Sequence, residues 1–246
     1  MTALKEKVAI VTGSTSGIGE AIARMLSHYG VSVVVNSVSS VDKGIALAKE
    51  LKNSIYCQAN IAEEVDCKKL VDTTITKYGR LDFLINNAGL PGKLPTNDLD
   101  EITNELFSNT LNVNVVGTWC LTRNAIPYLK KSSDGIIINI TSCAGSDPAT
   151  VSSAIPYAVS KAAMNYLTKL LAKELGPEIR VNAIAPGLIV TPRTKYFTIA
   201  IEKFERRTPL KRTGEPNDIA ELVIAIIKSN YINGEIIVAD GVFSTC

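Results

Sequence analysis

Residues 7–30 read KVAIVTGSTSGIGEAIARMLSHYG, and this stretch decides the fold. Its apolar, β-branched start predicts a buried strand, and residues 18–30 have the pattern of a helix that ends at Gly30. The turn between them spaces three glycines as Gly13, Gly17 and Gly19. Glycines let the backbone approach a pyrophosphate, and a helix N-terminus supplies N–H donors and a partial positive charge. The stretch indicates dinucleotide binding, with an ordinary glycine turn as the alternative.

The glycine spacing differs from two better-known phosphate-binding patterns. It is Gly-x-x-x-Gly-x-Gly, which is not the GxGxxG fingerprint. It is also not a Walker A loop, because no Gly-Lys-Ser/Thr follows the first glycine at the required spacing.

The rest of the chain repeats the alternation of apolar strand and longer helix. Continuous apolar strands separated by helices predict a parallel sheet covered on both faces, in one doubly wound α/β domain of the Rossmann type spanning residues 1–246. Ligands of such sheets bind beyond the carboxyl ends of the strands. Residues 192–214 are expected to be irregular and charged. Further strands are expected at 31–36, 54–60, 81–89, 135–142, 179–187 and 234–241, and further helices at 41–53, 63–79, 111–131, 157–175 and 216–229.

Composition excludes several classes of protein. The chain has 246 residues and is 46% hydrophobic and 20% charged, a composition that predicts a folded domain. Its net charge is only +2, which gives no strong electrostatic field to attract nucleic acid or a membrane. We expect no signal peptide and no membrane span. Five cysteines without a CxxC pair fit reduced thiols in the cytoplasm, and His28 as the one histidine leaves little for a metal site or a Ser-His-Asp triad.

A tyrosine and a lysine lie four residues apart in YAVSK, residues 157–161. On a helix they share one face, which is often a matter of packing alone. A free phenol titrates near about 10, and a neighbouring ammonium favours the phenolate. Tyr157 with Lys161 is therefore a candidate acid/base pair, provided that the rest of the chain supplies a site.

Six motifs in a fixed order supply that context. They are TGSTSGIG, NNAG at 86–89, Asn114 before Val-Val-Gly, Ser142 at a strand end, YAVSK, and Pro-Gly at 186–187. With them the chain resembles the compact, single-domain branch of the short-chain dehydrogenase/reductase family, from Lys7 to Gly241. RRTPLKRTGEPNDIA and the terminal GEIIVADG are similar to 3-oxoacyl-carrier-protein reductases and to related sugar and alcohol dehydrogenases.

The resemblance implies roles for these residues in moving a hydride between nicotinamide and a carbonyl or secondary alcohol. Tyr157 would be the acid/base, Lys161 would favour phenolate and hold the nicotinamide ribose, and Ser142 would bind the substrate oxygen. Asn114 would hold the helix geometry and a water of the proton relay. The expected cofactor-binding residues are Gly13, Ser14, Ser16, Gly17, Ile18, Gly19, Asn36, Ser37, Asn60, Ile61, Asn87, Ala88, Gly89, Tyr157, Lys161, Pro186, Gly187, Ile189 and Thr191; no metal is expected.

Departures from the family pattern concern the cofactor most. The end of the second strand holds Asn36 instead of the acid that binds the 2′-hydroxyl of NAD, which removes a repulsion against a 2′-phosphate. The arginine that NADP-preferring relatives often carry nearby is absent, so Asn36, Ser37, Ser39 and Ser40, with Lys43, would bind the phosphate. NADP(H) is favoured and NAD(H) is the alternative. Asn60 replaces a usual aspartate, Tyr157 follows Ser142 by fifteen positions, which is somewhat longer than usual, and DGV replaces the more usual DGG near the C-terminus.

The substrate side carries fewer signals. Residues 188–214 correspond to the family's substrate lid, and apolar residues around the site favour a substrate without a large charge. A cluster of basic residues late in the lid consists of Arg206, Arg207, Lys211 and Arg212, and the apolar residues around the site are Leu90, Pro91, Leu94, Ile155, Tyr196 and Phe197. A solvated face is the favoured interpretation of the basic residues, and attraction of an acidic carrier or a phosphorylated substrate is the alternative.

The sequence leaves three functional hypotheses. The favoured one is a reductase or dehydrogenase of a carbonyl/alcohol pair. A non-catalytic dinucleotide-binding protein is the second. An epimerase or dehydratase with bound NAD is the third, although 246 residues leave no room for the separate substrate domain of such enzymes. The resemblance also implies a homotetramer formed partly through helices around residues 111–130 and 153–175.

Overall fold

Seven short apolar segments form one parallel sheet in the computed structural model, which describes residues 4–91, 99–146 and 155–243. Every neighbouring pair of strands runs parallel, in the order β3-β2-β1-β4-β5-β6-β7. The strands are β1 (Val8–Val11), β2 (Ser32–Ser37), β3 (Ile55–Gln58), β4 (Phe83–Asn86), β5 (Ile136–Ile140), β6 (Arg180–Pro186) and β7 (Ile236–Ala239). The predicted seven-stranded parallel sheet is confirmed.

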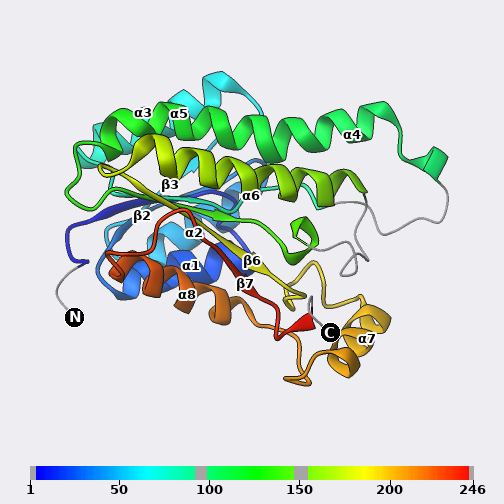
Figure 1. Ribbon diagram of the computed structural model, residues 1–246. Coiled ribbons are helices and arrows are strands. Elements are labelled where there is room, and N and C mark those ends of the chain that lie inside the picture. The colour runs from blue at the N-terminus through cyan, green and yellow to red at the C-terminus, as the bar shows by residue number, and fades with distance from the viewer. Residues whose placement is uncertain (1–3, 92–98, 147–154, 244–246) are drawn as a thin grey trace.

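Helices cover both faces of the sheet, as the continuous apolar strands predicted (Figure 1). One hydrophobic cluster packs α1, α2 and α8 against one face, and a second packs α3, α5 and α6 against the other. Successive residues of β1 point to opposite clusters: Ala9 and Val11 to the first, Ile10 to the second. The helices are α1 (Gly17–His28), α2 (Val41–Glu50), α3 (Glu64–Tyr78), α4 (Asn104–Leu111), α5 (Thr118–Leu129), α6 (Ile155–Leu175), α7 (Thr198–Arg207) and α8 (Pro216–Lys228).

Two parts of the chain differ from the simplest expectation. Residues 192–214 were predicted to be irregular, and this is wrong for Thr198–Arg207, which form α7. Only Phe204 of α7 is buried, and five of the ten residues of the helix are charged, so its charge favoured an irregular segment although Phe197, Ile201 and Phe204 have helical spacing. The predicted helix at 111–131 begins earlier, at Asn104, and its two α-helical parts are joined by the π-helical turn Asn112–Gly117.

The strand order places the candidate site. From β1 the chain moves to β2 and β3 on one side and then returns to β4 on the other side of β1. The loops that follow β1 and β4 therefore lead away from each other at the carboxyl ends of these two strands. This is the place where open α/β sheets bind ligands. Among the described residues, no helix is both long enough and apolar enough to cross a membrane.

Candidate active site

The turn between β1 and α1 has a shape that only glycines allow. Gly13 and Gly17 have φ of 60° and 57°, in the left-handed region. A Cβ on Gly19 would lie 2.4 Å from the carbonyl oxygen of Gly13. Ser16 precedes α1 and is exposed, and its side chain makes no capping hydrogen bond. The glycines and the uncapped helix start therefore form a cradle suited to a phosphate group.

Hydrogen bonds join this turn to the segment NNAG that follows β4. The backbone N–H groups of Asn87 and Ala88 both donate to Oγ1 of Thr12, at 2.9 Å each. The Asn87 amide donates to the carbonyl oxygens of Thr12 and Gly13, at 2.9 and 3.1 Å. Asn87 and Ala88, two of the predicted cofactor-binding residues, thus lie at the edge of the glycine turn.

The end of β2 lies beside the same turn, but its side chains are already engaged. The Asn36 amide donates to the carbonyl oxygens of Cys57 and Ala59 at 3.1 and 3.0 Å, and its Oδ1 accepts from the N–H of Gly13 at 3.3 Å. Asn36 is 1% exposed. The buried Ser37 hydroxyl lies 2.9 Å from the Tyr56 hydroxyl. The exposed polar groups near this point are Ser39 in the loop and, in the first turn of α2, Asp42 and Lys43.

The buried side chain of Ser14 completes the link between the first two strands. Its hydroxyl donates to the carbonyl oxygen of Val11 at 2.7 Å and accepts from the N–H of Asn36 at 2.9 Å. After β3, the Asn60 side chain accepts from the N–H of Ala62 at 3.1 Å, and Ile61 is buried. Asn60 and Ile61 therefore shape the loop beyond β3, on the same edge of the sheet.

The loop after β6 closes the other side of the cradle. A Cβ on Gly17 would lie 3.1 Å from Cγ2 of Thr191, so these two segments touch although they are far apart in sequence. Ile189 is buried in the cluster that also holds residues of α1. Pro186 ends β6, and Gly187 follows it. The loop that carries these four predicted cofactor-binding residues therefore faces the glycine turn.

Tyr157 and Lys161 lie one turn apart on α6, beside the end of β5. Lys161 Nζ is 5.6 Å from the centroid of the Tyr157 ring and donates to the carbonyl oxygen of Ile140 at 2.9 Å. Ser142 follows β5, and its side chain hydrogen-bonds that of Tyr157. The structure therefore brings Ser142, Tyr157 and Lys161 together.

Asn114 joins this group through the π-helical turn. Its Oδ1 accepts from the N–H of Leu90 at 2.7 Å, and its Nδ2 donates to the Leu90 carbonyl at 3.0 Å and to Oγ of Ser160 at 2.9 Å. Ser160 in turn donates to the Tyr157 carbonyl oxygen at 2.7 Å. Asn114 thus links the loop after β4 to the helix that carries Tyr157. π-Helical turns often occur at functional sites because they re-aim one side chain.

Burial controls the ionisation of the pair. Burial raises the pKa of Tyr157 above its ordinary value, and the hydrogen bond with Ser142 opposes the rise. Burial lowers the pKa of Lys161 to about 8. The sequence led us to expect that Lys161 would favour the phenolate. In the structure the pKa of Tyr157 is raised instead, because the loss of solvation on burial is the largest effect. The Lys161 ammonium donates its hydrogen bond to the Ile140 carbonyl.

Several contributors to this site had no signal of their own in the sequence. Thr12 and Ser160 lie inside recognised motifs, but only the structure shows which backbone groups they bind. Phe204 packs against Gly187, and Phe243 packs against Phe204. Leu94 and most of residues 146–156, which the sequence placed near the substrate, lie outside the described residues.

Comparison with known proteins agrees with this geometry. The family model described as enoyl-(acyl carrier protein) reductase matches residues 13–244. Ketoacyl reductase 2 of the granaticin polyketide synthase from Streptomyces violaceoruber is 46% identical over 237 residues, which cover 95% of this chain and 94% of that relative. The 3-oxoacyl-[acyl-carrier-protein] reductase of Thermotoga maritima is 35% identical over 249 residues, covering 97% and 98%.

A solved structure gives the same result for the fold. A short-chain dehydrogenase/reductase from Burkholderia xenovorans is 33% identical, with a TM-score of 0.88 and coverage of 96% of this chain and 97% of that one. Fold and site define an oxidoreductase that uses a nicotinamide dinucleotide. The chain belongs to the short-chain dehydrogenase/reductase family.

Proposed function

We propose that the enzyme reduces the ketone of a 3-oxoacyl chain carried as a thioester, with Tyr157 as the proton donor and NADPH as the reductant. One observation carries this proposal: Ser142, Tyr157 and Lys161 meet beside β5, and the Asn114 link ties them to the loop that borders the glycine turn. The names of two relatives, a ketoacyl reductase and a 3-oxoacyl-carrier-protein reductase, suggest the substrate class.

The cradle fits a dinucleotide. Gly13, Gly17 and Gly19 would hold the pyrophosphate, because a side chain at Gly19 would collide with the backbone and the start of α1 is uncapped. Asn87, Ala88 and Gly89 would line the adenosine ribose, and the loop from Pro186 to Thr191 would hold the nicotinamide. When bound, the cofactor supplies a hydride to the carbonyl carbon of the substrate.

The raised pKa of Tyr157 supports the direction of reduction. A buried phenol stays protonated at neutral pH, and it can give its proton to the substrate oxygen as the hydride reaches the carbon. Ser142 would hold that oxygen by a hydrogen bond. Lys161 is protonated below a pH of about 8, and its three donors can serve both the Ile140 carbonyl and a ribose hydroxyl.

The preference for NADPH rests on the start of α2. Asn36 and Ser37 make hydrogen bonds inside the protein, so the exposed Ser39 and Lys43 are the groups that would bind a 2′-phosphate. Ser40 precedes α2, and its side chain makes no capping hydrogen bond, so the helix N-terminus can add N–H donors. No acidic side chain stands at the end of β2 to repel a phosphate.

Two further parts of the proposal concern assembly and the lid. Residues 188–214, with α7, would form a lid over the substrate within a single domain. Large apolar side chains on the outer surfaces of the π-helical turn, α5 and α6 are exposed and suit a homotetramer: Val116, Trp119, Val159, Tyr166 and Leu170. A monomer in sedimentation analysis would refute the tetramer. Cys57, Cys67 and Cys120 form no disulfide, which fits a cytoplasmic protein.

The test combines binding and turnover. The purified protein is titrated with NADPH and NADH by fluorescence, and the tighter cofactor is then used with 3-oxoacyl thioesters, simple ketones and, in the reverse direction, polyols. We expect tighter NADPH binding and fastest reduction of the thioesters. Tyr157→Phe should lower turnover by about 10²–10⁴-fold and leave NADPH affinity unchanged. Turnover confined to polyols with NAD⁺ would instead identify a sugar or alcohol dehydrogenase.

A further inference from the structure

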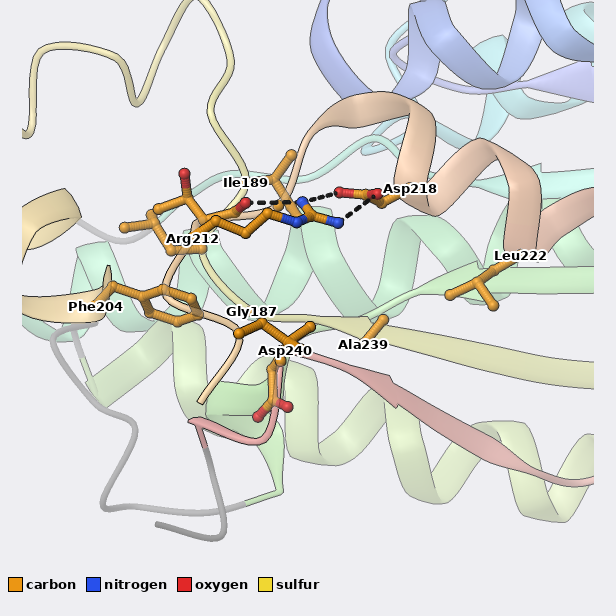
Figure 2. A pocket seen from close by; sticks show the side chains of 13 residues that line it. Gly187, Ile189, Phe204, Arg212, Asp218, Leu222, Ala239 and Asp240 are labelled. Carbon is orange, nitrogen blue, oxygen red and sulfur yellow. Dashed lines mark hydrogen bonds and ion pairs between the residues drawn. The ribbon is translucent and has the colours of Figure 1, made fainter. Parts of the chain in front are cut away.

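The lid helix α7 is held to the body of the protein by one buried side chain. Phe204 is 6% exposed and is the buried residue of this helix, whereas Ile199 on the same helix is 82% exposed. The Phe204 ring presses on the loop after β6: a Cβ on Gly187 would lie 2.8 Å from its Cζ (Figure 2). The position of α7 therefore depends on what holds Phe204 in place.

The chain's C-terminal turn supplies that hold. Phe243 is 8% exposed and stacks on Phe204, with ring centroids 4.4 Å apart and planes 18° from parallel. The guanidinium carbon of Arg207, one turn further along α7, lies 4.6 Å from the centroid of the Phe243 ring. Phe243 thus contacts two residues in the last part of α7.

The turn that presents Phe243 has a backbone shape that its sequence does not favour. Gly241 and Val242 both have positive φ, 64° and 73°. A β-branched residue is rarely found there, and this Val242 side chain is 50% exposed, so its own burial does not compensate. The turn is closed by hydrogen bonds from the N–H of Val242 to Oδ1 of Asp240 and from the N–H of Phe243 to the Asp240 carbonyl, at 2.8 and 3.3 Å.

The turn also fits closely under the end of α7. A Cβ on Gly241 would lie 2.5 Å from Cγ2 of Thr208, which is fully buried and donates from both its N–H and its hydroxyl to the Phe204 carbonyl. Beside this contact lies a cavity of about 170 Å³ lined by Phe204, Gly187 and Asp240 (Figure 2). Loss of the Phe243 ring would leave Phe204 free to move into this space.

We propose that Phe243 is a positioning residue for substrate binding: it clamps Phe204 against the loop after β6 and so fixes the distance between the lid helix and the nicotinamide end of the site. The substrate part of this inference rests on the proposed function. The clamp itself is a property of the fold. Phe243 would act through Phe204, without contact to the substrate or to the cofactor.

The test uses Phe243→Ala, with Phe243→Leu as a milder variant that keeps an apolar group and removes the ring. Tyr231→Ala is the matched control, because Tyr231 is an aromatic residue that is completely exposed. The first readout is limited trypsin digestion at Lys203, Arg206 and Arg207 in α7, followed by mass spectrometry of the fragments. The second is the steady-state kinetics of thioester reduction.

We expect Phe243→Ala to speed cleavage within α7 by about tenfold and to raise KM for the thioester by a similar factor, with kcat within about twofold and NADPH affinity unchanged. Phe243→Leu should lie between the wild type and Phe243→Ala. Phe243→Ala should add little when it is combined with Phe204→Ala, because Phe243 acts through Phe204.

Cleavage rates equal to those of Tyr231→Ala would overturn the clamp. Faster cleavage with an unchanged KM would overturn the positioning role. If no carbonyl compound is reduced by the wild type, the proposed function fails, and the digestion still decides for or against the clamp. A fall in kcat with an unchanged KM would also contradict the inference, because it would place Phe243 in the chemical step.

Discussion

The substitution Asn36→Asp tests the internal role that the structure gives this side chain. The Asn36 amide nitrogen donates to two carbonyl oxygens, those of Cys57 at 3.1 Å and Ala59 at 3.0 Å. A carboxylate would put an oxygen in place of this nitrogen and face both carbonyls with negative charge. The site is 1% exposed, so water cannot relieve the repulsion.

The expected loss follows from these contacts. Each hydrogen bond that is lost while its partner stays buried costs about 1–3 kcal/mol, and two are lost here. Asn36→Asp should therefore lower the free energy of unfolding by about 4 kcal/mol near pH 8. For a protein of this length this corresponds to a fall of roughly 8–16 °C in Tm, at about 2–4 °C per kcal/mol.

The loss should depend on pH in a defined direction. Burial and the two carbonyls raise the pKa of the introduced carboxyl in the folded state above its value in the unfolded chain. The folded variant therefore binds a proton more tightly than the unfolded one, and its deficit shrinks as the pH falls through that raised pKa. At pH 5 a protonated carboxyl can also donate to one of the two carbonyls.

The assay is urea denaturation of the wild type and the variant at pH 5 and pH 8. Asn230→Asp is the control, because it makes the same change of charge at an exposed position. A loss below about 1 kcal/mol at pH 8, or a loss that is the same at both pH values, would refute the role of Asn36 as a buried cross-link between β2 and the loop after β3.

Two further predictions concern the site directly. Lys161→Met should abolish reduction yet raise the free energy of unfolding of the cofactor-free protein at pH 7 by about 1–2 kcal/mol, measured by denaturation across pH. Because burial lowers the pKa of Lys161 to about 8, the stability of the wild type should rise between about pH 8 and the ordinary lysine pKa, and this rise should be absent in the variant. Gly19→Ala should weaken NADPH binding at least about tenfold in a fluorescence titration, because its Cβ would lie 2.4 Å from the Gly13 carbonyl oxygen. Gly79→Ala is its control: φ is 71° there too, but a Cβ would meet nothing within 4 Å, so we expect lower stability with normal binding.

The architecture was predictable because its signal is local and repeated. Each strand is a short run of β-branched and apolar residues between turn residues, and the alternation with helices implies a parallel sheet. His28, the one histidine, is exposed on α1 and lies edge-on to Tyr29. The helix α7 was missed because its many charged residues favoured a loop, although Phe197, Ile201 and Phe204 have the spacing of one helix face.

The hydrogen-bond partners within the site could not be predicted in the same way. Asn36 was recognised as a departure from an acidic residue, but whether its amide faces a ligand or the protein depends on Cys57 and Ala59, which come from a different strand and loop. The shift in the pKa of Tyr157 depends on how deeply α6 packs, which spacing alone does not fix. Phe243 follows a DGV that the sequence showed only as a departure from DGG.

These internal contacts bear on how cofactor preference could change in this chain. An acidic residue at the end of β2 would bind the 2′-hydroxyl of NAD, and Asn36 occupies that place. Because the Asn36 amide holds two carbonyls, an acid there would cost stability before it could contact a cofactor. Exposed positions such as Ser39 and Lys43 carry no such constraint. We therefore expect that cofactor preference in this chain changes through the start of α2 while Asn36 is retained.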